Sequence, residues 1–156
     1  MNLNPVELFK VAVKIEENGI SFYKKASHFA KEILVKEIFD NLAKMEEDHL
    51  HFFSRLEKNV RECGYIDSED IKVYLDRNFG PEIFKTDDAV KIGRELKTIL
   101  DIFRFALEKE NISIDFYTKI RGSIGNLETQ KTLDKIIEEE KGHAKLILEN
   151  IKKIER

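Results

Sequence analysis

The chain has 156 residues, of which 42% are hydrophobic and 37% are charged. That length is typical of one domain, and the apolar fraction is enough for one sizeable core. With 27 basic against 30 acidic residues, the net charge of -3 gives no indication of a nucleic-acid or anionic-membrane surface. No segment is long and apolar enough to span a bilayer, and the N-terminal residues lack the pattern of a signal peptide, so a cytoplasmic location is expected. The single cysteine, Cys63, excludes an internal disulfide and a cysteine-built metal site.

Apolar residues recur at steps of three and four along the chain, which is the pattern of amphipathic helices. The first helix has a clear start signal, because Asn4 can cap it, Pro5 suits its first position and Glu7 completes a capping box. Only two prolines and seven glycines interrupt the chain, which favours long helices. Four helices are predicted, at about 5–28, 31–58, 87–121 and 126–154.

The links between these helices differ in length. The first, near Ser27–Lys31, and the third, Gly122–Asn126, are short, and short links make antiparallel neighbours. The middle link, at about 59–86, is too long for a plain loop and is predicted to be a crossover with a short helix near Ser68–Arg77. We therefore predict a single all-α domain, an antiparallel four-helix bundle of two helical hairpins joined by a long crossover, which is the ferritin-like topology.

Polar side chains stand at several positions where the helical stripes require an apolar one. A carboxylate in a core is unfavourable unless it is paired or bound to a metal. Two divalent cations would balance four carboxylate charges, and neutral imidazoles would complete the coordination without adding charge. We predict a two-metal centre inside the bundle with six ligands, Glu16, Glu46, His49, Glu110, Glu140 and His143.

The spacing of these residues supports the prediction. Segments 46–49 and 140–143 both read Glu-x-x-His, and residues three apart on a helix lie on one face, so both side chains reach one metal. One such motif would mean little. The second motif, however, follows the first by 94 residues, and the same shift relates Glu16 to Glu110. The two hairpins are therefore interpreted as a duplication, with a pseudo-twofold axis through the metals.

The same shift also relates two tyrosines. Tyr23 and Tyr117 both follow a phenylalanine and lie seven residues beyond Glu16 and Glu110. Two interpretations stay open, because each tyrosine either packs in the core with a hydrogen-bonded hydroxyl or supports a ligating carboxylate on a neighbouring helix.

On these residues the chain resembles the rubrerythrin branch of the ferritin-like superfamily over essentially its whole length. The resemblance implies a di-iron centre, in which Glu46 and Glu140 bridge the metals and Glu16 and Glu110 are terminal ligands. It also implies one histidine for each metal and a homodimer. Manganese or a mixed metal pair also suits oxygen and imidazole ligands.

Two departures from the family pattern bear on activity. Full-length rubrerythrins carry a rubredoxin-like iron domain built on paired Cys-x-x-Cys motifs, which the single Cys63 does not provide, so a separate electron-donor protein is expected. Ser113 stands where rubrerythrins have a further glutamate, which argues against redox-linked ligand exchange and efficient peroxidase activity.

The predicted function is reduction of hydrogen peroxide or O2 at the di-iron centre. The metals carry this chemistry, so no catalytic residue beyond the ligands is required. Two alternatives stay open. One is iron binding, ferroxidase action or iron handling, and the other is a non-catalytic, metal-stabilised bundle that acts as an interaction module.

Overall fold

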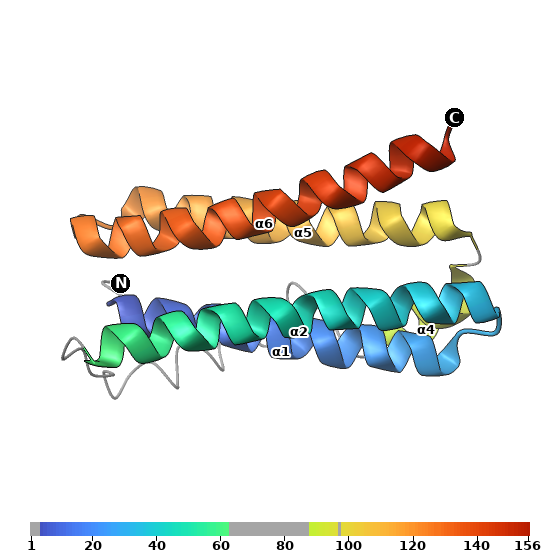
Figure 1. Cartoon of the computed structure of the whole chain (residues 1–156), viewed down its shortest axis with the longest axis horizontal. Helices are drawn as coiled ribbons and strands as arrows, with labels where there is room; N and C mark the ends of the chain where they lie inside the picture. The colour runs from blue at the N-terminus through green and yellow to red at the C-terminus, as the bar shows by residue number, and fades with distance from the viewer. Residues whose placement is uncertain (1–3, 63–87, 97) are drawn as a thin grey trace.

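The structure, a computed structural model, describes residues 4–62, 88–96 and 98–156 (Figure 1). Across those ranges the chain forms helices and no strand, which confirms the predicted all-α class. None of these helices is long and apolar enough to cross a membrane. The helices are α1 (Pro5–Phe29), α2 (Ile33–Glu62), α4 (Asp88–Glu95), α5 (Ile99–Ser123) and α6 (Leu127–Ile154).

The four long helices form the ferritin-like bundle as two antiparallel hairpins, α1 with α2 and α5 with α6 (Figure 1). Helix α2 continues to Glu62, four residues beyond its predicted end at 58. Most of the predicted crossover, including the short helix expected near Ser68–Arg77 and Cys63, lies outside the described residues.

Helix α1 begins as its sequence predicts. The side chain of Asn4 accepts a hydrogen bond from the backbone N–H of Glu7 at 3.1 Å, and the backbone N–H of Asn4 donates to Glu7 Oε2 at 2.9 Å. This reciprocal capping box satisfies two backbone donors that a helix start leaves open. It sets the register of α1, whose inner face then buries residues such as Ala12, Ile15 and Gly19.

The single helix predicted over 87–121 is wrong, because the structure contains two helices there. Helix α4 ends at Glu95, and α5 begins at Ile99 with Thr98 as its N-cap, whose hydroxyl accepts from the backbone N–H of Asp101 at 3.1 Å. Helix α4 packs against α1, whereas α5 pairs with α6, so the chain changes hairpin at this break (Figure 1). The capping pair Thr98 and Asp101 is the sequence feature that ends one helix and starts the next.

The contact between α4 and α1 depends on one glycine. A Cβ atom on Gly93 would lie 2.3 Å from the carbonyl oxygen of Ala26, which is a backbone atom that cannot move aside. Glycine therefore permits the close approach of these two helices.

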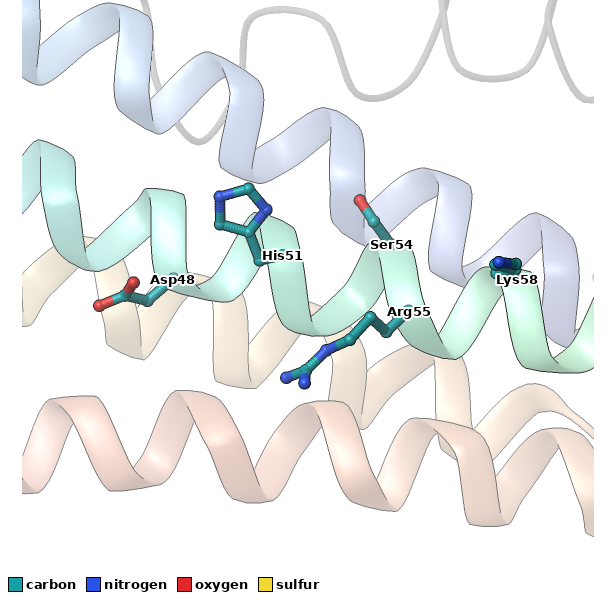
Figure 2. Close-up of a pocket in the computed structure, with 5 residues that line it drawn as sticks. All are labelled: Asp48, His51, Ser54, Arg55 and Lys58. Carbon is teal, nitrogen blue, oxygen red and sulfur yellow. The ribbon is translucent and has the colours of Figure 1, made fainter.

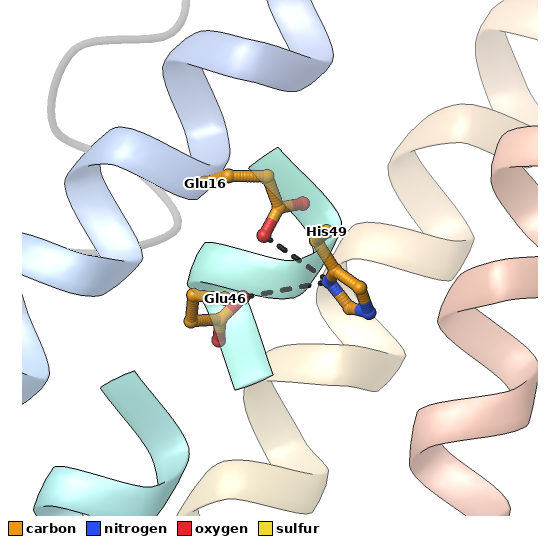
Figure 3. A group of neighbouring side chains, drawn as sticks. All are labelled: Glu16, Glu46 and His49. Carbon is orange, nitrogen blue, oxygen red and sulfur yellow. Dashed lines mark hydrogen bonds and ion pairs between the residues drawn. The ribbon is translucent and has the colours of Figure 1, made fainter. Parts of the chain in front are cut away.

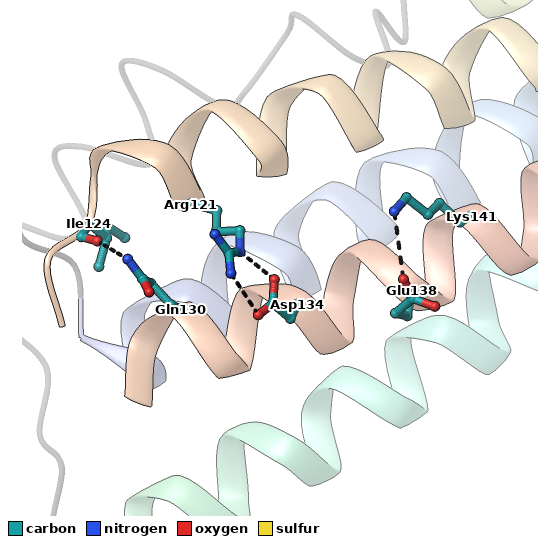
Figure 4. A network of polar contacts seen from close by, with 6 residues as sticks. All are labelled: Arg121, Ile124, Gln130, Asp134, Glu138 and Lys141. Atoms are coloured by element: carbon teal, nitrogen blue, oxygen red, sulfur yellow. Dashed lines mark hydrogen bonds and ion pairs between the residues drawn. The ribbon is translucent and has the colours of Figure 1, made fainter. Parts of the chain in front are cut away.

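The link between α5 and α6 is held by polar contacts, some of which Figure 4 shows. Asn126 caps α6 by accepting from the backbone N–H of Thr129 at 3.0 Å, and Gln130 donates to the carbonyl of Ile124 at 2.6 Å. The guanidinium of Arg121 donates twice to the carboxylate of Asp134 on α6. These contacts join the end of α5 and the link to the first turns of α6.

Aromatic residues join the two hairpins and fill the core near its middle. Phe22 of α1 stacks on Phe105 of α5 with ring centroids 5.4 Å apart. Tyr23 lies 6.3 Å from Phe39 of α2, and Tyr117 of α5 is fully buried. The core therefore runs continuously through both hairpins and surrounds the polar positions that the sequence singles out.

Candidate metal centre

Each of the four long helices contributes polar side chains to the interior of the bundle. The four predicted glutamate ligands are at most 5% exposed, although carboxylates are rarely buried to this extent without a partner. His49 is 2% exposed, and His143 is half-buried. The buried glutamates are Glu16 on α1, Glu46 on α2, Glu110 on α5 and Glu140 on α6.

The register of the helices selects these residues over their charged neighbours. Glu17 and Glu108 are exposed, as is Glu138, whereas Glu47 and Glu139 are half-buried. Of the adjacent residues Glu16 and Glu17, the structure buries Glu16, which is the predicted ligand.

Three residues from the first hairpin converge on one point (Figure 3). His49 Nδ1 lies 3.2 Å from Glu16 Oε2 and 3.6 Å from Glu46 Oε2. One ligand atom from each of the three lies within 4.8 Å of the other two, and all three residues are buried. Two carboxylate oxygens and an imidazole nitrogen at this spacing could hold a metal ion.

The second hairpin lies against this group. His143 Nε2 is 2.7 Å from His49 Nε2, and the two rings stack with centroids 3.5 Å apart. Glu140 and Glu110 both interact electrostatically with Glu16, so the six predicted ligands form one cluster. Among the described residues, Glu140 Oε1 and His143 Nδ1 are buried without a hydrogen-bond partner. Buried polar atoms are normally paired, and these two are the atom types that bind iron, so the residues present fit a metal centre.

The profile of the rubrerythrin family matches residues 7–151, a range that contains all six residues. The chain belongs to the rubrerythrin family. Family membership implies a di-iron site, and the buried Glu16, Glu46 and His49 form a group able to hold a metal. Neither the curated proteins nor the solved structures contain a significant match to the chain.

Burial makes ionised carboxylates costly in this rubrerythrin site. Burial and the negative charge of Glu46 raise the pKa of Glu110 to about 7. Burial and neighbouring carboxylates also raise the pKa values of Glu16 and Glu140 well above the usual range. Metal-free protein therefore holds protons on several of these carboxylates near neutral pH, and bound cations would replace those protons.

The two histidines respond differently to their surroundings. Burial and the nearby His49 lower the pKa of His143 to about 4, so His143 is neutral at physiological pH, which is the form that binds metals. Although burial opposes a charge on His49, its contact with Glu46 raises the pKa of His49. The same contact lowers the pKa of Glu46 against the opposing effect of burial.

Tyr23 and Tyr117 lie beside the cluster. Both are buried, and burial followed by the nearby carboxylates raises the pKa of each phenol well above 10. In the described part of the chain, however, the Tyr117 hydroxyl has no hydrogen-bond partner. The structure thus places both tyrosines next to the cluster, while a supporting hydrogen bond from Tyr117 to a carboxylate is not formed. Ser113, one helical turn beyond Glu110, is also buried.

A surface pocket is lined by exposed side chains of α2 (Figure 2). His51 belongs to this pocket and is exposed, although it is only two residues from His49. The other lining residues are Asp48, Ser54, Arg55 and Lys58.

Proposed function

We propose that this chain binds two iron ions through the six clustered residues and reduces hydrogen peroxide or O2 with electrons from a separate protein. The observation that carries the proposal is a single cluster drawn from four helices, in which half-buried His143 joins five buried residues, Glu16, Glu46, His49, Glu110 and Glu140. Family membership supports iron as the metal.

The charges of the cluster suit two divalent ions. Four carboxylates offset the charge of two ferrous ions, and the two imidazoles add ligands without charge. When bound, a pair of ferrous ions supplies the two electrons that convert one hydrogen peroxide and two protons into two water molecules.

The chain's own residues hold this centre away from bulk water. The glutamates are almost fully buried, Tyr23 and Tyr117 lie beside them, and the ring of Phe53 lies 5.9 Å from that of His49. His143 is the most exposed of the six residues, so access for a small oxidant is expected beside α6. No described side chain outside the cluster is needed as a nucleophile, since the electrons come from the metals.

The proposal is tested with metal-free protein loaded under anaerobic conditions with two ferrous ions per chain. One equivalent of hydrogen peroxide is then added, and the remaining ferrous iron and peroxide are measured. The expected result is loss of two ferrous ions for each peroxide consumed. His49→Ala should abolish this reaction, whereas His51→Ala, which changes an exposed histidine on the same helix, should leave it unchanged.

Two outcomes argue against the proposal. If the wild-type protein oxidises ferrous iron no faster than the His49→Ala variant does, the chain does not form a redox-active centre. Oxidation of many added ferrous ions per chain, with the ferric product retained, would instead support iron handling. Recovery of the ferrous state with a chemical reductant, followed by another round of peroxide consumption, would support the oxidoreductase.

A further inference from the structure

The two sequence-related halves of the cluster are not equivalent in the structure. In the first half, the ligand atoms of Glu16, Glu46 and His49 already lie within 4.8 Å of one another. Among the residues that the structure describes, this is the only group of three possible ligands that meets this spacing. The counterparts at 110, 140 and 143 do not meet it, although they are related to the first three by the same shift of 94 residues.

The second half differs because of where its histidine points. His143 Nε2 lies 2.7 Å from His49 Nε2, so the ring packs on the other histidine instead of on its own glutamate. The remaining nitrogen of His143 and the Oε1 atom of Glu140 are both buried, and neither has a hydrogen-bond partner within the described ranges. Binding an ion with both of these atoms and Glu110 therefore requires the side chains to rearrange.

Preorganisation favours the first half as the initial binding position. Ligands that already have the required spacing lose little conformational freedom on binding, whereas ligands that must move lose part of the binding free energy. The first half is also better shielded, since His49 is 2% exposed and His143 is half-buried. Two carboxylates and one imidazole in each half suit divalent transition metals.

We infer that divalent metal ions fill this centre in a fixed order. The first ion binds at Glu16, Glu46 and His49, and the second binds more weakly because it also requires Glu110, Glu140 and His143, after His143 moves away from His49. This inference rests on the proposed two-metal centre. It also means that the chain can hold one ion, or two different ions with the more tightly bound metal in the first position.

The order is tested by titrating metal-free protein with Co2+, which is followed by its visible absorption and by calorimetry. Wild-type protein should bind two ions in two separate phases. His143→Ala should keep the first phase and lose the second. His49→Ala should weaken the first phase by at least about tenfold, the loss seen when groups that merely support metal ligands are removed. The repeat makes these two variants matched controls for each other.

A second matched pair covers the case in which a histidine variant fails to fold. Glu16→Gln and Glu110→Gln keep the side-chain volume, and circular dichroism of the metal-free proteins verifies their helix content. Glu16→Gln should weaken binding of the tighter ion, and Glu110→Gln should weaken binding of the weaker ion. Binding of both ions in one phase, or equal loss of the first ion in both members of a pair, would overturn the inference. Absence of any Co2+ binding would instead refute the two-metal centre itself.

Discussion

Metal-free protein should become less stable as the pH rises from about 5 to 8.5, because the buried carboxylates must then ionise without a cation. Glu110 offers the clearest test. Its pKa is raised from the ordinary 4.5 to about 7 by burial and by the charge of Glu46. Below pH 4.5 the carboxyl group is protonated in both folded and unfolded chains, so it has no effect on the pH dependence of stability.

Between the two pKa values the folded chain holds a proton that the unfolded chain has released. Stability therefore falls as the pH rises through this window, and the full penalty is present above about 7. The difference between 4.5 and about 7, at 1.36 kcal/mol per pKa unit, gives a penalty of about 3 kcal/mol. That is a large part of the free energy of unfolding of an ordinary domain.

Glu110→Gln should remove this penalty, because an amide stays neutral at every pH in the window. The assay is urea unfolding followed by circular dichroism, in the presence of a chelator, at about pH 5 and about pH 8.5. The variant should exceed wild type by less than about 1 kcal/mol at the lower pH and by about 3 kcal/mol at the higher pH. Glu108→Gln, on the exposed side of the same helix, is the control and should show no such change. If the difference between Glu110→Gln and wild type is the same at both pH values, the reasoning is wrong.

Four further substitutions test the packing and the capping of the helices. Tyr117→Phe should stabilise the metal-free protein by about 1 kcal/mol in thermal unfolding, because it removes a buried hydroxyl that has no hydrogen-bond partner among the described residues. Gly93→Ala should destabilise it by about 1–3 kcal/mol, since the new methyl group would meet the backbone of Ala26. Gly142→Ala, where nothing lies within 4 Å of the added atom, should instead stabilise α6 by up to about 1 kcal/mol. Thr98→Ala should cost about 1 kcal/mol by removing the N-cap of α5, which urea unfolding would detect.

The helices and the buried cluster follow from local rules that a single sequence displays. Glu16 illustrates this, since it precedes Tyr23 by the same seven residues that separate Glu110 from Tyr117, and the structure buries it while exposing Glu17. The start of α1 is equally readable, because all parts of its capping box lie within a few residues of one another. Such features depend on neighbours in the chain, so they do not require knowledge of the three-dimensional packing.

The break between α4 and α5 was not predicted, for a physical reason. Ile92 and Leu96 pack against the core on one side of the break, and Ile102 is buried on the other. The apolar stripe therefore continues through a position where the chain changes partner from one hairpin to the other. Thr98 with Asp101 is a capping signal, but Thr and Asp also occur inside helices, and only the packing of α4 on α1 decides between the two.

The difference in ligand spacing between the two halves of the cluster likewise does not follow from the sequence. Their ligands have identical types and spacing, so the repeat predicts two equal halves. The structure breaks this equality through the contact between His49 and His143, which joins residues 94 positions apart in different hairpins. Side-chain rotamers and the surrounding helices decide which histidine contacts the glutamates of its own half of the repeat. The spacing of a motif specifies neither of these.

The glutamates that destabilise the metal-free chain are the same residues that would bind the metal ions. Without a cation, raised pKa values at Glu16, Glu110 and Glu140 make the folded chain less stable as the pH rises. With cations, the same residues must be ionised to act as ligands, so metal binding strengthens as the pH rises. The pH dependence of stability should therefore have opposite signs in the metal-free and metal-bound proteins. A sequence chosen for stability alone would replace these glutamates with apolar residues, so their presence at four buried positions is best explained by the ions they hold.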